Sequence, residues 1–401
     1  MFSYYSINGY WLLLVFTLLI LLHLFIERYQ HNKRLRRIKY RIHVNGTRGK
    51  SSVSRLIAAG LRSGNIATVC KTTGTMARFI KPDGKEESIY RIGRTNIIEQ
   101  VKVIKKAAKY NPEALVIECM AVQPLLQSIC ERKLVQSTHG VCVNARADHL
   151  DVMGPTERDV ALALAGTMTI KGKYYTPETR YLDVFKMAAK DRGSELVHIN
   201  DTDISTVSDE EIKKFSYSEY KDNVALALKV CEACGVSRDD ALKGMWEATP
   251  DPGALTLHTI VYKGKKITLA NGFAANDPDS TSTLWQKIIN ETPEADSIIG
   301  LVNCRADRGD RSRQMAEAIV DWQKPHVMMA IGSGTDYFLK NLDKSKLTNC
   351  QIVNSEGWNV ERILDKFAEQ NGQHILAIGV CNIAQIGFQL VHHFSDHEEH
   401  L

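Results

Sequence analysis

A short glycine-rich run, Gly46-Thr47-Arg48-Gly49-Lys50-Ser51, carries the clearest chemistry in this sequence. The backbone N–H groups of such a turn, together with the first turn of a following helix, cradle phosphate oxygens. Lys50 would reach the β- and γ-phosphates of a nucleotide, and the Ser51 hydroxyl would bind Mg²⁺. The run therefore predicts that the chain binds ATP as its magnesium complex. The predicted nucleotide-binding residues here are Gly46, Thr47, Arg48, Gly49, Lys50, Ser51 and Ser52.

The residues around this loop fit a phosphate-binding role. A β-like run at 41–45 enters the loop and a helix-like run at 52–63 leaves it. Strand, loop and helix in this order is the context that a phosphate-binding loop requires, so a chance match is the weaker interpretation. The general form of the loop has a further glycine where this chain has Val44. Many kinds of enzyme use such a loop, so it does not by itself identify a reaction.

An acid and an imidazole follow other predicted strands. Glu118 ends the apolar run 114–117, and His149 comes after the run 140–144. Open α/β sheets place their ligands at the carboxyl ends of strands, so we expect both side chains to face the phosphate loop. Ser51 and Glu118 suit Mg²⁺, which prefers hard oxygen ligands. A solvated strand end for Glu118 and an ordinary hydrogen bond for His149 remain open.

The elements that must position these residues alternate along the chain. Residues 67–70 and 196–199 also resemble strands, and helical patterns occupy 97–110, 124–132, 156–165, 181–192 and 223–234. This βαβα order predicts an α/β fold with a doubly wound, mostly parallel sheet. We assign residues 42–250 to this ATP-binding central domain.

A turn-forming run, Pro250-Asp251-Pro252-Gly253, separates a second α/β pattern. Its predicted strands are 267–270, 297–302, 326–331, 350–353 and 374–378, and its predicted helices are 280–289, 312–322 and 360–370. We therefore expect a smaller α/β domain at 255–401. Arg305 and Arg308 follow the strand 297–302 and would suit a carboxylate-rich substrate or the ATP phosphates, unless they lie in a solvated charged loop.

Two further groups of polar residues are candidates for binding, although turn formation alone would also explain them. The group after the strand 267–270, which could hold nucleotide or substrate, is Asn271, Asn276 and Asp277. The group around Gly74, which could close over the substrate, is Thr72, Thr73 and Thr75.

The N-terminal segment reads as a membrane anchor. Residues 10–26 are almost wholly apolar, and 7–26 approaches the roughly 20 residues that a spanning helix needs. A signal peptide is the weaker interpretation, because the basic residues follow the apolar run and no small-residue cleavage site is evident. The positive-inside rule predicts a single-pass protein of the inner membrane with a cytoplasmic body.

Charge and cysteine content exclude other classes. The segment 27–41 holds seven basic residues and one acid, so it either fixes topology or binds anionic lipid headgroups. Because the net charge of the chain is only +5, the remainder is close to neutral, which argues against a nucleic-acid binder. The nine cysteines are expected to be reduced, and Cys231 and Cys234 to pack in a helix rather than bind metal.

Several of these motifs resemble the Mur ligase superfamily, whose members couple ATP cleavage to amide-bond formation. The short loop G-T-R-G-K-S, the strand end Val116-Ile117-Glu118 and the segment 144–154 are similar to motifs of that family in chain order. More narrowly, the runs 71–75, 118–122, 250–254, 271–277 and 303–308 look like the poly-γ-glutamate synthase ligase subunit of the CapB/PgsB type. This resemblance covers nearly the whole chain.

The resemblance implies a reaction. ATP would phosphorylate the terminal carboxylate of a γ-linked glutamate chain, the amine of the next glutamate would attack the acyl phosphate, and ADP and phosphate would leave. It implies one or two Mg²⁺ ions, held by Ser51, Glu118 and His149. It also implies small membrane partner subunits of a capsule synthase complex, and a homo-oligomer stays open. The implied catalytic residues are Lys50, Glu118, His149 and Arg305.

Two departures narrow this expectation. Many Mur ligases have a modified lysine for the second metal, and the corresponding residues 161–166 include no lysine. Only about 15 residues separate the anchor from the body, which leaves no room for a nucleotide-sugar domain. Two other functions remain as alternatives: a folylpolyglutamate-like ligase that adds glutamate to a small acceptor, and a P-loop ATPase that drives a membrane partner complex.

Overall fold

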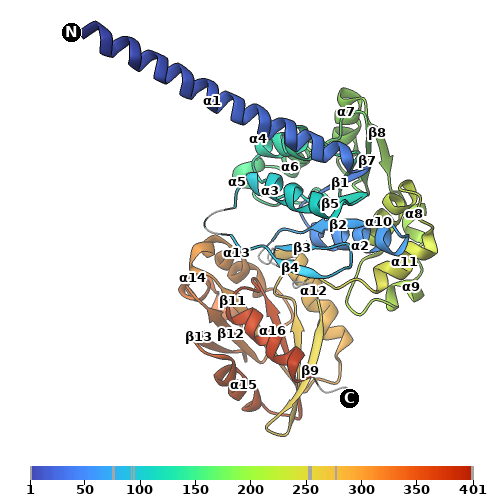
Figure 1. Cartoon of the computed structure of the whole chain (residues 1–401). Helices are drawn as coiled ribbons and strands as arrows, with labels where there is room; N and C mark the ends of the chain where they lie inside the picture. Colours follow the sequence, from blue (N-terminus) through green and yellow to red (C-terminus); the bar gives the residue numbers. More distant parts are fainter. Residues whose placement is uncertain are drawn as a thin grey trace. The chain divides into compact units, whose positions relative to one another are not determined.

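The computed structural model describes residues 2–74, 77–91, 93, 95–251, 255–275 and 278–398. The chain divides into two compact units, Met1–Thr249 and Pro250–Leu401, each with its own sheet (Figure 1). Thr75, Asn276 and Asp277, which the sequence suggests as binding residues, lie outside the described residues.

The first unit is built on an eight-stranded sheet with the order β4-β3-β2-β5-β1-β6-β7-β8. The strands from β2 to β8 in this order run parallel, and the two short edge strands pair antiparallel. The strands are β1 (Tyr40–Asn45), β2 (Thr68–Lys71), β3 (Arg78–Ile80), β4 (Glu86–Ser88), β5 (Ala114–Glu118), β6 (His139–Cys142), β7 (Lys173–Thr176) and β8 (Glu195–His198).

Helices flank this sheet. They are α1 (Phe2–Arg37), α2 (Lys50–Ser63), α3 (Ile98–Ala107), η1 (Ala108–Tyr110), α4 (Pro124–Ile129), η2 (Cys130–Val135), α5 (Leu150–Met153), α6 (Glu157–Ala165), α7 (Leu182–Arg192), α8 (Asp201–Ser205), α9 (Asp209–Lys213), α10 (Lys221–Ala233) and α11 (Arg238–Trp246). The predicted α/β class with a mostly parallel sheet is confirmed.

The central strands β1 and β5 fix the position of the phosphate loop. All five residues of β5 are buried, as is typical of a parallel strand that is covered on both faces. In the parallel register Val44 lies opposite Glu118, so the loop leaves the sheet beside the end of β5. Helix α2 packs against α10, where a Cβ on Gly60 would approach the Cys231 sulfur within 2.8 Å. Cys231 therefore serves helix packing.

Helix α1 is one unbroken element from Phe2 to Arg37 and is long and apolar enough to cross a membrane. Its side chains from Tyr10 to Tyr29 are exposed, but His31 and Leu35 are buried. Leu35 belongs to the same core cluster as Val103 and Ile104 of α3. The basic segment that we expected as a separate piece at 27–41 is thus mostly helix, and its end packs on the body.

The second unit has a six-stranded sheet with the order β13-β12-β11-β14-β10-β9, in which only β9 is antiparallel among the described strands. Its strands are β9 (Leu257–Tyr262), β10 (Lys265–Asn271), β11 (Ser297–Cys304), β12 (Val327–Gly332), β13 (Gln351–Glu356) and β14 (His374–Val380). Its helices are α12 (Pro278–Glu291), η3 (Ala306–Arg308), α13 (Gly309–Ile319), α14 (Asp336–Asn341), η4 (Lys344–Lys346), α15 (Val360–Ala368) and α16 (Ile386–Asp396).

Two apolar clusters form the core of this unit. One cluster includes Trp285 of α12, Met315 of α13 and Phe338 of α14. The other includes Phe367 of α15 and Phe394 of α16. The helices therefore cover both faces of the sheet.

Candidate active site

The phosphate loop has a conformation that depends on its glycines. Gly46 has a φ of 137° and Gly49 a φ of 78°, both in the region that favours glycine. A Cβ on Gly46 would also lie 3.0 Å from the backbone nitrogen of Val143. Helix α2 begins directly after Gly49, with no side-chain cap and no acid in its first turn. Its free N–H groups can therefore receive an anion.

Asn144 holds this loop in place from the neighbouring strand end. Its Oδ1 accepts from the Thr47 hydroxyl at 2.7 Å and from the Arg48 N–H at 3.0 Å, and its Nδ2 donates to the Arg48 carbonyl at 3.2 Å. The Arg146 N–H in turn donates to the Thr47 hydroxyl at 3.0 Å. The side chains of Thr47 and Asn144 thus tie the loop to the end of β6, a role that the sequence did not indicate.

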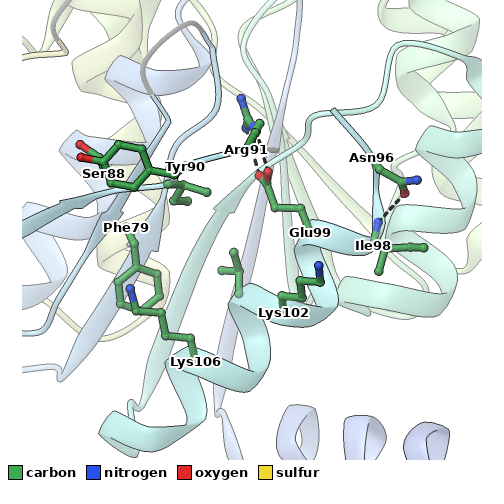
Figure 2. A pocket seen from close by; sticks show the side chains of 11 residues that line it. Phe79, Ser88, Tyr90, Arg91, Asn96, Ile98, Glu99, Lys102 and Lys106 are labelled. Atoms are coloured by element: carbon green, nitrogen blue, oxygen red, sulfur yellow. Dashed lines mark hydrogen bonds and ion pairs between the residues drawn. The ribbon is translucent and has the colours of Figure 1, made fainter. Parts of the chain in front are cut away.

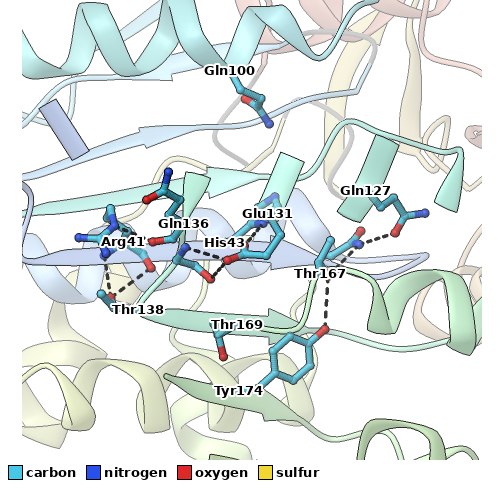
Figure 3. Close-up of polar contacts among 12 residues, drawn as sticks. Arg41, His43, Gln100, Gln127, Glu131, Gln136, Thr138, Thr167, Thr169 and Tyr174 are labelled. Carbon is cyan, nitrogen blue, oxygen red and sulfur yellow. Dashed lines mark hydrogen bonds and ion pairs between the residues drawn. The ribbon is translucent and has the colours of Figure 1, made fainter. Parts of the chain in front are cut away.

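Buried polar contacts also fix the strand that enters the loop (Figure 3). Asn45, the last residue of β1, donates to the Gln127 side chain at 2.8 Å and to the Thr167 hydroxyl at 3.2 Å. Two residues earlier in β1, the His43 ring lies 2.8 Å from the Glu131 carboxylate. Burial opposes the protonation of His43, but its contacts with Cys119 and Glu131 outweigh burial and raise the His43 pKa to about 9.

The Lys50 ammonium lies over the loop. It donates to the carbonyl of Gly46 at 2.6 Å and to that of Thr47 at 3.3 Å. These carbonyls belong to the cradle itself, so the ammonium is positioned where bound phosphates would need a cation. Ser52 lies one residue after Ser51 in the first turn of α2 and is half-buried.

Glu118 is a buried carboxylate directed at the same loop. Its side chain accepts from the Ser51 hydroxyl at 2.9 Å and from the Thr73 N–H at 2.7 Å, and it also accepts from the Thr73 hydroxyl. The residue is only 2% exposed. Its position at the carboxyl end of β5 and its register beside Val44 explain this contact.

The pair of Ser51 and Glu118 fits a magnesium site. Two neighbouring ligands of an octahedral Mg²⁺ ion, each about 2.0–2.1 Å from the metal, are about 2.9 Å apart. The Ser51 hydroxyl and the nearer Glu118 oxygen have this separation. Both are hard oxygen donors, so these two groups could bind one ion without rearranging.

His149 is not grouped with this pair. It has a φ of 48°, its side chain is one third exposed, and its nearest acid is Asp148 at 3.9 Å. Among the residues that the structure describes, no three His, Cys, Asp or Glu side chains gather closely enough to hold a metal ion. The role of His149 at a second metal therefore stays a prediction.

Thr72 and Thr73 have different contacts. Thr73 binds Glu118, whereas the Thr72 hydroxyl accepts from the Arg78 N–H at 3.2 Å and stabilises the turn into β3. In the second unit, Asn271 is buried at the end of β10, and Arg305 pairs with Asp307 at 2.7 Å. Arg308 is exposed at the end of η3, and all three residues belong to Pro250–Leu401, whereas the loop belongs to Met1–Thr249.

The structure adds charged and polar residues that sequence analysis missed. Lys71, the last residue of β2, is fully buried, and its ammonium lies 3.0 Å from the Glu99 carboxylate. Burial lowers the pKa of Lys71, while Glu99 opposes that effect. Gln100 donates to the Glu118 carbonyl at 3.0 Å. The sequence gives one indication that Lys71 is unusual, which is that a lysine ends an apolar strand.

Comparison with known proteins identifies the family. The family model described as "Poly-gamma-glutamate synthase CapB C-terminal domain" matches residues 257–397. The "Capsule biosynthesis protein CapB" of Bacillus anthracis is 39% identical over 359 residues, which cover 89% of this chain and 76% of that protein. This chain belongs to the CapB family. The "PGA synthase CapB" of Bacillus subtilis (strain 168) is also 35% identical, over 93% of this chain and 94% of that protein.

Solved structures of distant sequence share the fold of this chain. A bifunctional folylpolyglutamate synthase/dihydrofolate synthase from Yersinia pestis, with AMPPNP and Mn bound, has a TM-score of 0.66 at 13% identity, covering 91% of this chain and 92% of that one. E. coli FolC in complex with ADP has a TM-score of 0.64 at 14% identity, covering 92% of each chain. The CapB relatives confirm the predicted family and ligase class, and the solved structures confirm the predicted fold.

Proposed function

We propose that this chain is a membrane-tethered, ATP-dependent amide ligase that extends poly-γ-glutamate and releases ADP and phosphate. The contact of the Ser51 hydroxyl with the buried Glu118 carboxylate, beside the phosphate loop, carries the proposal. It offers a place for a magnesium–nucleotide complex, and membership of the CapB family favours a γ-glutamyl polymer as the substrate.

The first step would form an acyl phosphate on the terminal carboxylate of the polymer. This step gathers three anionic groups, so its barrier is largely electrostatic. Lys50 and the N–H groups at the start of α2 would contact the phosphates. Ser51 and Glu118 would hold Mg²⁺, which supplies further neutralisation of charge when bound. Thr73 would keep the Glu118 carboxylate in position through its N–H and hydroxyl.

The second step would form the amide bond. The amine of the incoming glutamate would attack the acyl carbon and lose a proton, and the bond from that carbon to the phosphate oxygen would break. We assign the arginines of the second unit, Arg305 and Arg308, to the carboxylates of the substrates, and His149 to a second metal ion. Asn271, Asn276, Asp277, Thr72 and Thr75 remain candidates for nucleotide or substrate contacts.

Helix α1 supports the membrane part of the proposal. It is the one helix in the described chain that is long and apolar enough to span a bilayer, and basic residues follow its apolar part. Under the positive-inside rule the body would then lie on the cytoplasmic side of the inner membrane. There it could meet small membrane partner subunits of a capsule synthase complex.

Membranes containing the chain and its partner subunits test the function directly. With ATP and labelled glutamate they should form a γ-linked polymer that resists ordinary peptidases, and one ADP should appear for each glutamate added. Transfer of glutamate to a folate but not to a γ-glutamyl chain would favour the small-acceptor ligase. ATP hydrolysis that does not depend on glutamate, without polymer, would favour the partner-driving ATPase.

A variant links this activity to the loop. Lys50→Ala should abolish both nucleotide binding and polymer formation, because it removes the ammonium that hydrogen-bonds to the carbonyls of Gly46 and Thr47. Unchanged ATP affinity in a folded Lys50→Ala protein would refute the assigned nucleotide site.

A further inference from the structure

A hollow of about 480 Å³ lies beside α3 in the first unit, apart from the residues assigned to ATP and Mg²⁺ (Figure 2). The strand and loop residues 79 and 88–91 form one side, and α3 forms the other. The exposed Tyr90 and the buried Phe79 are aromatic lining residues, and Arg91, Lys102 and Lys106 give the hollow positive charge.

The charges around this hollow leave it electropositive. Glu99 is shared by two cations, Arg91 at 2.6 Å and the buried Lys71 at 3.0 Å. Glu87 is likewise shared by Lys106 and a second lysine, Lys81. Within the described part of the chain, Lys102 pairs with no carboxylate and is exposed. Cations thus outnumber carboxylates, so the hollow suits an anionic ligand.

The hollow adjoins the reaction centre. The Arg91 guanidinium donates to the Gly74 carbonyl at 3.3 Å, and the preceding residue, Thr73, binds Glu118. On the other side of the hollow, Gln100 of α3 donates to the Glu118 carbonyl. A ligand in the hollow would therefore lie next to the loop that positions the Glu118 carboxylate.

The spacing of the lysines matches one particular kind of polyanion. Lys102 and Lys106 are one helical turn apart, which is a rise of about 6 Å at 1.5 Å per residue. A residue in an α-linked chain spans about 3.5 Å through three backbone atoms. A γ-linked glutamyl unit has five backbone atoms, so it spans about 6 Å, and each unit carries one free α-carboxylate. Successive carboxylates of a γ-linked chain can therefore meet successive lysines.

We propose that this hollow binds the growing γ-glutamyl chain behind its reacting end, with Lys102 and Lys106 each contacting one α-carboxylate. The inference rests on the function proposed above. It assigns polymer binding to residues that neither the phosphate loop nor the metal pair uses. Arg91 would complete the site at the end nearest Gly74, and the Tyr90 ring, 91% exposed, would cover the chain's methylene groups.

Binding of a labelled oligomer to the full-length protein in detergent tests the proposal. The probe is a fluorescent γ-linked glutamate decamer, compared with an α-linked decamer of equal charge. Lys102→Gln should weaken γ-decamer binding about three- to fivefold at low salt, as expected for an exposed ion pair. Lys102→Gln with Lys106→Gln should weaken it about tenfold. The matched control Lys109→Gln removes the same charge from an exposed lysine outside the hollow and should leave affinity unchanged.

Kinetics separate this inference from the proposed function. For Lys102→Gln the KM for a long γ-linked acceptor should rise, while the KM for γ-glutamylglutamate and the kcat should stay at wild-type values. Equal binding of the two decamers, or equal loss in Lys102→Gln and Lys109→Gln, would overturn the inference and leave ligase activity intact. Wild-type protein that adds no glutamate to either acceptor would instead overturn the function. Thermal melting of each variant checks that Lys106→Gln does not act through its contacts with Glu87 and Phe79.

Discussion

At the scale of single residues, Glu118 is the strongest candidate for a direct role at the proposed site, because it is buried and contacts the phosphate loop. Glu118→Gln keeps the shape and can still accept from Ser51, but it removes the negative charge that suits Mg²⁺. We expect the rate of polymer formation to fall about 100-fold, the scale of losing one electrostatic group from an active site. The Mg²⁺ concentration for half-maximal rate should rise.

A magnesium titration of purified membranes measures both effects. The matched control is Glu361→Gln, which makes the same change on an exposed residue at the start of α15. A Glu118→Gln protein with the wild-type rate and the wild-type magnesium requirement would contradict the assignment.

Asn144 shapes the loop without being assigned to any ligand. Asn144→Ala removes the hydrogen bonds to Thr47 and Arg48, each worth about 0.5–1.5 kcal/mol net. The loop then loses its fixed shape, and we expect ATP affinity to fall about tenfold or more, or at least 1.4 kcal/mol. Isothermal titration calorimetry measures the change, with the exposed Asn290→Ala as control. Unchanged affinity would mean that the glycines alone hold the loop.

His139 predicts a dependence of stability on pH. Burial, with smaller contributions from Lys173 and Arg41, lowers the pKa of His139 to about 4. In the unfolded chain the pKa is about 6.5, so the unfolded state binds the extra proton between these values. The stability that neutral His139 contributes is therefore complete above pH 6.5 and is lost as pH falls toward 4. Between pH 8 and pH 5 the loss is on the order of 2 kcal/mol.

His139→Phe isolates this effect. It keeps a ring against Tyr175, which stacks on His139 with centroids 6.0 Å apart, but it cannot be protonated. Urea unfolding in detergent at pH 8 and pH 5 should show a smaller acid loss for this variant than for wild type. His392→Phe, at an exposed histidine, should keep the wild-type difference. An identical acid loss in His139→Phe and wild type would show that other groups control it.

At the scale of elements, the end of α1 is part of the core of the first unit. The His31 Nε2–H donates to the Leu134 carbonyl at 2.8 Å, Leu35 is 1% exposed, and Arg41 donates to the Leu35 carbonyl. A chain that starts at residue 27 keeps these contacts, and one that starts at residue 39 loses all three. Both lack the apolar segment 10–26, so they form a matched pair.

We expect the shorter chain to be less stable by about 3–5 kcal/mol, the scale of removing a buried leucine with its neighbours. For a unit of this size that lowers Tm by about 10 °C. Differential scanning fluorimetry of the two chains measures the difference. Equal Tm values would show that α1 merely tethers the body.

The elements also show what sequence alone could provide. Strand β5 was predicted with its exact bounds, because four apolar residues run up to a single acid, Glu118. The short hairpin β3–β4 and the edge strand β9 were missed, since strands of three residues and half-exposed strands give little periodic signal. The docking of α1 was missed because only Leu35 and Ile38 are apolar in a basic run.

The same reasoning applies to the candidate site. The proximity of Ser51 and Glu118 could be predicted, because both follow adjacent parallel strands at the same edge of the sheet. The hydrogen bonds by which Asn144 holds the phosphate loop, and the burial of Lys71 against Glu99, could not be predicted. Each depends on a contact between residues far apart in the chain. The hollow beside α3 likewise requires the fold.

At the scale of the whole molecule, the residues that we propose for the reaction lie in both units. The phosphate loop, Glu118 and Asn144 all lie in Met1–Thr249, whereas Arg305 and Arg308 lie in Pro250–Leu401. Each unit has its own sheet and buried apolar residues, so each should fold alone. We predict that a fragment of residues 27–249 binds ATP with Mg²⁺ within about tenfold of the full-chain affinity, because the loop contacts that fix the phosphates are complete within it.

The fragment should nevertheless form no polymer, since it lacks Arg305 and Arg308, which we propose to bind the carboxylates of the substrates. Calorimetry gives its ATP affinity, and labelled glutamate gives its activity. Residues 255–401, expressed alone, should unfold cooperatively and bind no ATP. A folded 27–249 fragment without ATP binding would mean that the second unit supplies essential nucleotide contacts, and Asn271 would then be the first residue to test there. Polymer formation by the 27–249 fragment would remove the second unit from the chemistry altogether.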